Sequence, residues 1–168
     1  SGDDYSNSVL GIDGLFRPRP TDTVRFQVLG SRTSYPESVS TEFGQPQGAF
    51  TSAALFASYS HSTRKGGWYA ELTDLGRDFR ADLGFIPQVD IVRPVLSGQR
   101  GWWGDGKSWY SRVALGGDFD QSEDQSGALI EREWESRCVV EGPNQWFLFF
   151  GPGWRQRGFR DELFKQSF

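Results

Sequence analysis

Apolar and polar side chains alternate with a period of two along most of the chain. The pattern is clearest where Val24, Phe26 and Val28 alternate with Arg25 and Gln27. Because successive side chains of a β-strand point to opposite faces, this alternation predicts strands with one apolar and one polar face. No stretch has a convincing helical period, so the sequence predicts an all-β protein.

The strand pattern recurs in segments that are separated by stretches rich in glycine, proline and polar residues: residues 8–17, 23–32, 50–61, 68–73, 89–96, 109–119, 128–140 and 145–150. Short turns join the first two segments and the next two, which predicts two hairpins. The stretch at residues 151–168 is compatible with a last strand and a short helix. We expect one domain, residues 1–168, folded as an antiparallel meander of about eight or nine strands.

The connection at residues 76–90 is more apolar than a solvated loop requires. Phe79, Leu83, Phe85 and Ile86 give it an apolar side. We therefore expect this connection to pack against the rest of the protein.

Three other connections have the composition of loops. Residues 33–48 are polar and contain two prolines, which predicts a long irregular loop. Residues 97–108 form a second glycine-rich loop that carries tryptophans, and residues 118–126 are acidic and predict a solvated turn. Pro94 is expected to confine its strand to an edge, an end or a bulge, because proline has no N–H for the ladder.

Composition narrows the classes of function. The formal net charge is −4, and the arginines are interspersed with carboxylates, so nucleic acid is not an expected partner. One His and one Cys, Cys138, predict neither a metal site nor an internal disulfide, and no motif predicts a cofactor. No apolar run reaches the ~18 residues of a transmembrane helix, whereas a transmembrane β-strand needs only about 9–11 residues.

Two motifs resemble a known family. Gly-Ser-Arg-Thr at residues 30–33, and Asp-Phe-Arg-Ala-Asp-Leu-Gly-Phe-Ile-Pro-Gln-Val-Asp at residues 78–90, are similar to an uncharacterised family of large bacterial outer-membrane proteins. Its full-length members carry an N-terminal domain similar to family-9 carbohydrate-binding modules, followed by a β-barrel that contains this pattern. The resemblance covers about residues 9–100. It implies that the chain, which lacks the carbohydrate-binding-like domain, is a fragment of a larger barrel.

A barrel assigns the two strand faces to two environments. The side chains expected to face lipid are apolar: Val24, Phe26, Val28, Leu55, Tyr59, Trp68, Leu72, Val113, Leu115, Trp134 and Trp146. The candidates for a polar interior are charged: Arg25, Glu71, Arg112, Glu131, Glu133, Glu135 and Arg137. The expected function is then non-catalytic, as a structural or transport-type component of the bacterial outer membrane. Its partners are the lipid bilayer and other envelope proteins.

Alternatives remain at two places. Alternate residues on one strand face lie roughly 6.5–7 Å apart, so the row Glu131, Glu133 and Glu135 has a spacing that glycosidase carboxylates also use. A polar barrel lumen or a solvated face explains the same row without catalysis, and this is the interpretation we favour.

The second place is the aromatic group Trp102, Trp103, Trp109 and Tyr110. It is either a girdle or packing element, or a stacking platform for a glycan. The platform belongs to the alternative fold, a soluble β-sandwich or jelly roll, secreted or periplasmic, that binds carbohydrate. A sandwich buries its apolar face between two sheets, whereas a barrel exposes that face to lipid.

Overall fold

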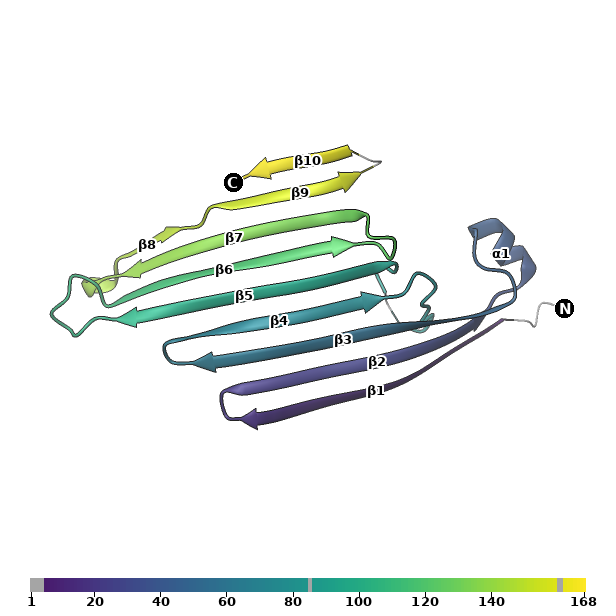
Figure 1. Ribbon diagram of the computed structural model, residues 1–168, viewed down its shortest axis with the longest axis horizontal. Coiled ribbons are helices and arrows are strands. Elements are labelled where there is room, and N and C mark those ends of the chain that lie inside the picture. Colours follow the sequence, from purple (N-terminus) through teal and green to yellow (C-terminus); the bar gives the residue numbers. More distant parts are fainter. Residues whose placement is uncertain (1–4, 85, 160–161) are drawn as a thin grey trace.

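The computed structural model describes residues 5–84, 86–159 and 162–168, which form one antiparallel sheet whose strands follow chain order (Figure 1). The elements are β1 (Ser6–Arg19), β2 (Asp22–Ser34), α1 (Glu37–Phe43), β3 (Ala49–Thr63), β4 (Gly66–Leu75), β5 (Ile91–Trp103), β6 (Arg112–Glu123), β7 (Leu129–Glu141), a 3₁₀ turn (Pro143–Gln145), β8 (Phe147–Phe150), β9 (Gly153–Phe159) and β10 (Glu162–Ser167). The all-β meander that the alternation predicted is confirmed.

Both predicted hairpins are present. The β1–β2 ladder shifts register between Phe16 and Arg19, around Pro18, which cannot donate to a ladder. The β3–β4 hairpin turns immediately before Gly66, whose φ is 153°. A Cβ at Gly66 would lie 2.3 Å from the carbonyl oxygen of Gln99 in β5, so glycine allows β4 and β5 to approach each other here.

The strands β8 and β9 occupy one position beside β7. Cys138 pairs with Phe150 of β8 and Glu135 pairs with Gly153 of β9, and the same register runs through both pairings. Pro152 interrupts this strand, although its carbonyl still accepts a hydrogen bond from the N–H of Ser136 at 2.9 Å. Within the described residues, ten strands therefore fill nine positions, as the count of eight or nine anticipated. The stretch at residues 151–168, whose structure the sequence did not decide, contains the strands β9 and β10.

Three connections predicted as loops or turns contain regular secondary structure. The predicted irregular loop at residues 33–48 contains α1, which starts after Pro36 and ends at Gly44 with a φ of 60°. The strand β5 extends through Trp103, so most of the predicted loop at residues 97–108 is strand. The strand β6 includes Asp118 to Glu123, because pairing with β5 and β7 outweighs the low strand propensity of acidic residues.

Pro94 lies in a central strand, where its partner in β4 is Leu72. The ladder from β5 to β6 pairs Val92 and Val95 but neither residue between them. Pro94 has no N–H to donate, which explains this interruption of the ladder. Of the edge, end or bulge predicted for Pro94, the structure therefore shows a local irregularity in a central strand and not an edge.

The sheet forms a single layer. Its accessible surface is 11765 Å², whereas a compact protein of 19.0 kDa exposes about 8,400 Å². Only Ala54, Phe79 and Ala114 are buried apolar residues within the described ranges. No second sheet covers either face in this part of the chain, so the described residues do not form the alternative sandwich.

The largest buried side chain belongs to the connection between β4 and β5. Phe79 is 1% exposed, and it confirms that this connection packs against the sheet. Leu83 is fully exposed and corrects the expectation for that position. Phe85 lies outside the described residues. None of the helices in the described residues is long and apolar enough to span a membrane.

Candidate functional site

The strand register divides the sheet into two chemically different faces. Residues directly opposite each other in a ladder share a face, and the register of β2 through β9 places all seven predicted polar candidates together: Arg25, Glu71, Arg112, Glu131, Glu133, Glu135 and Arg137. We call this the polar face. The apolar residues predicted for the other side share the opposite, apolar face, except Trp146, which lies in the connection between β7 and β8.

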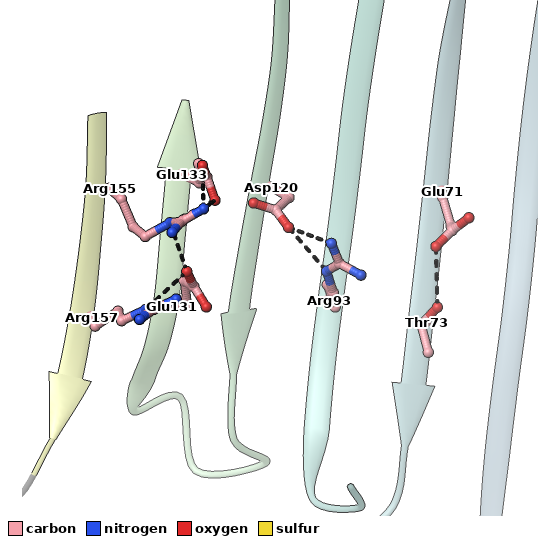
Figure 2. A network of polar contacts seen from close by, with 8 residues as sticks. All are labelled: Glu71, Thr73, Arg93, Asp120, Glu131, Glu133, Arg155 and Arg157. Atoms are coloured by element: carbon pink, nitrogen blue, oxygen red, sulfur yellow. Dashed lines mark hydrogen bonds and ion pairs between the residues drawn. The ribbon is translucent and has the colours of Figure 1, made fainter. Parts of the chain in front are cut away.

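An ion-pair network joins the polar face of β7 to that of β9 (Figure 2). The Arg155 guanidinium donates to both carboxylate oxygens of Glu133, with the Nη2–Oε2 distance at 2.6 Å, and lies 3.0 Å from Glu131. Arg157 Nε lies 3.1 Å from the same oxygen of Glu131. Arg155 therefore bridges two glutamates that would otherwise repel each other.

Further polar contacts lie on the same face of neighbouring strands. Arg93 Nε of β5 donates to Asp120 of β6 at 3.1 Å, and the Thr73 hydroxyl of β4 lies 3.5 Å from Glu71. Near the other end of the same face, Arg112 donates to Glu141 at 2.8 Å. A belt of charged and polar residues thus crosses the sheet from β4 to β9, with arginines of β5 and β9 beside acids of β6 and β7 (Figure 2).

Several members of this belt were missed from the sequence: Arg93, Asp120, Arg155, Arg157, and Asp118, which lies 3.5 Å from Arg137. The acidic stretch that supplies the two aspartates was interpreted as a turn, and the segment that supplies the last two arginines was left undecided. The period of two continues through both segments and was the signal that could have placed them.

Two of the three residues in the glutamate row, Glu131 and Glu133, form ion pairs with arginines. Glu131 and Glu133 are the residues bridged by Arg155, and such pairing occupies the oxygens that an acid/base role would offer to a substrate. Glu135 lies opposite Asp118 on the same face. Within the described residues, no group of three or more His, Cys, Asp or Glu side chains is arranged to hold a metal ion.

The four predicted platform aromatics do not form one surface. Trp102 and Trp103 are consecutive residues of β5, so they point to opposite faces. Trp109 and Tyr110 lie in the following connection, where their rings meet edge to face at 5.4 Å. Their closeness in sequence therefore does not bring the four side chains onto one surface, because consecutive residues of a strand point to opposite faces.

Arginines cover the two strand tryptophans instead. The guanidinium groups of Arg64 and Arg112 each lie 5.4 Å from the centroid of the Trp103 ring. Trp102 has Arg100 at 5.8 Å. Such cation–π contacts give each tryptophan a protein partner.

The apolar face is extensive and uncovered. Large side chains that are exposed on it include Leu10, Ile12, Phe16, Phe26, Val28, Trp68, Leu72, Leu96, Leu115 and Trp134. Soluble monomers rarely expose contiguous apolar patches of more than a few hundred Å². Single exposed hydrophobic residues are common on protein surfaces. The exposure of large apolar side chains over one whole face of a sheet requires an explanation.

The apolar residues form a band that runs obliquely across the strands. One cross-strand row starts apolar and turns acidic by the sixth strand: Ile12, Val28, Leu55, Asp74, Val92 and Glu123. A parallel row nearer the other end starts polar and becomes apolar: Thr63, Gly66, Arg100, Leu115, Cys138 and Phe150. The band thus moves along the strands from β1 towards β8, as it would if all strands were tilted relative to a flat apolar layer.

Comparisons of the chain with protein-family models, curated proteins and solved structures find no match. The geometry of the two faces is therefore the basis on which a function can be inferred.

Proposed function

We propose that the chain forms part of a transmembrane β-barrel of the bacterial outer membrane. The apolar face lies against lipid, the polar face lines the interior, and the protein is a structural or transport-type component without catalytic chemistry. The observation that carries the proposal is the opposition of an uncovered, oblique apolar band to an ion-paired charged belt on one sheet. The family resemblance of residues 30–33 and 78–90 leads to the same expectation.

The physical requirements of lipid support this orientation. Membrane-spanning strands of a barrel lie tilted by about 35–45°, with apolar residues outward and polar residues inward. The oblique band keeps apolar side chains within one layer despite such a tilt. The charged belt, by contrast, is costly in hydrocarbon and suits a water-containing interior.

The lengths of the connections that follow β1 to β4 fit the same arrangement. Two-residue turns follow β1 and β3 at one end of the sheet, and the two longest connections, residues 35–48 and 76–90, follow β2 and β4 at the other end. Outer-membrane barrels combine short turns on the periplasmic side with longer loops on the extracellular side. The connections of 35–48 and 76–90 would then face outward from the cell.

Closure of the barrel requires strands beyond those described. In the described residues β1 and β10 lie at the edges of the sheet and do not pair with each other. An unpaired edge leaves backbone N–H and C=O groups without partners, which the hydrocarbon region does not tolerate. The barrel therefore has more positions than the nine of this sheet.

Membrane extraction tests the proposal. The full-length natural protein is expected in the outer-membrane fraction, resistant to carbonate washing and soluble only with detergent. Its mobility on a gel should shift after boiling, because folded barrels resist SDS until heated. A detergent-free, monomeric protein that melts sharply would refute the barrel.

A further inference from the structure

The first residues of the β4–β5 connection fold back over the polar face. Gly76 N–H donates to the Ala53 carbonyl of β3 at 3.0 Å, and Arg80 N–H donates to the Ser31 hydroxyl of β2 at 3.3 Å. Asn7 of β1 donates from its side-chain amide to the Arg80 carbonyl at 3.1 Å. The segment thus crosses three strands in turn. We call residues 77–84 the strap.

The strap is packed, not merely adjacent. Phe79 of the strap and Thr33 of the polar face are the two largest side chains in the described residues that are fully buried. Ser31, beneath the strap, is 4% exposed. A loop that extended into solvent would expose its phenylalanine to water. The burial of Phe79 therefore requires that the strap lie against the polar face of the sheet.

Polar contacts at Arg80 and Asp82 anchor the strap. The Arg80 guanidinium donates to the Gln45 side chain at 2.7 Å and 3.1 Å, which ties the strap to the connection after α1. Asp82 accepts hydrogen bonds from the hydroxyls of Tyr5 at 2.8 Å and Tyr35 at 3.0 Å. These anchors come from three separate segments, so the position of the strap is determined by the folded sheet.

We propose that the strap lies inside the barrel and constricts its interior near the end that bears the long connections. This inference rests on the proposed function, which makes the polar face the inner wall. From β4 back to β1 the strap spans three strand spacings of about 4.8 Å each, or about 14 Å of that wall. Such a segment leaves a narrow passage for small solutes instead of an open diffusion pore.

Conductance measurements on the full-length protein in planar lipid bilayers test the constriction. In one variant a glycine–serine linker of equal length replaces residues 77–84, which removes the anchors and keeps the loop length. We expect a several-fold higher single-channel conductance from this variant than from the native protein. The control is Leu83→Ser, which changes a fully exposed strap residue and should leave the conductance unchanged.

Cysteine labelling tests the position of the strap without relying on conductance. In a Cys138→Ser background, Ser31→Cys should react slowly with a water-soluble maleimide and become reactive when the linker replaces the strap. Gln27→Cys, on the same strand and the same face but exposed, should react rapidly in both proteins.

The outcomes separate the two proposals. If the native protein inserts into bilayers and the linker variant has the same conductance, the constriction is refuted while the barrel stands. Rapid labelling of Ser31→Cys in the native protein likewise refutes it. If the native protein does not enter lipid at all, the barrel is refuted, and the constriction with it.

Discussion

Val28→Arg offers a direct measure of what lies against the apolar face. Val28 is in the middle of β2, on the apolar face, opposite Ile12 in β1 and Leu55 in β3. It is 43% exposed, so an arginine there has room and would meet the surroundings rather than a packed core. Gln27 is its neighbour on the polar face and is also exposed, which makes Gln27→Arg the matched control.

The expected magnitude differs sharply between lipid and water. An arginine on the lipid face near the bilayer midplane costs about 2–4 kcal/mol, and this cost falls towards the interfaces. An exposed substitution in water changes the free energy of unfolding by about 0.5 kcal/mol or less. We therefore expect Val28→Arg to lower the equilibrium constant for folding by about one to three powers of ten, and Gln27→Arg to leave it nearly unchanged.

The assay is denaturant unfolding of the full-length protein refolded in phospholipid vesicles, followed by tryptophan fluorescence. Gly30→Arg adds a depth test, because Gly30 lies on the same face two residues nearer the end of β2, and a Cβ there meets nothing within 4 Å. Its cost should be smaller than that of Val28→Arg. Equal and small costs at Val28 and Gln27 would refute the assignment of this face to lipid.

Three further predictions concern the interior and the connections. Phe79→Ala should lower the free energy of unfolding by about 3–5 kcal/mol, because it empties a buried site, whereas Leu83→Ala should change it by no more than about 0.5 kcal/mol; similar costs in denaturant unfolding would contradict the burial. Arg155→Ala should lower the unfolding midpoint more than Arg157→Ala, since only Arg155 bridges two glutamates; the reverse order would exclude that bridge. Hydrogen bonds from a serine hydroxyl and backbone N–H groups lower the pKa of Asp124 in the β6–β7 turn, so this stabilisation is present above the unfolded pKa of about 4 and is lost as the pH falls through the lowered value; amide exchange in the turn should accelerate there and not at neutral pH.

Particular residues show how far the sequence alone could lead. The shared face of Arg25, Glu71 and Glu133 was predictable, because alternation is a local property of an extended chain. The helix α1 was not, since seven residues are too few to display a helical period. Trp102 and Trp103 were misjudged for a related reason: a loop was assumed where the ladder with β6 extends the strand through both residues.

The sequence by itself determined that the chain forms two-faced antiparallel strands, that residues such as Arg25 and Glu71 share one face, and that the connection at residues 76–90 must be packed. Only the tertiary structure decided which arginine pairs with which glutamate, that the apolar band is oblique, and that Phe79 is buried where the strap crosses β3, β2 and β1. The reason is physical. The face on which a side chain lies depends on the period of a single strand. The partners of an ion pair, the direction of the apolar band and the burial of a side chain depend on the register between strands that are far apart in the chain.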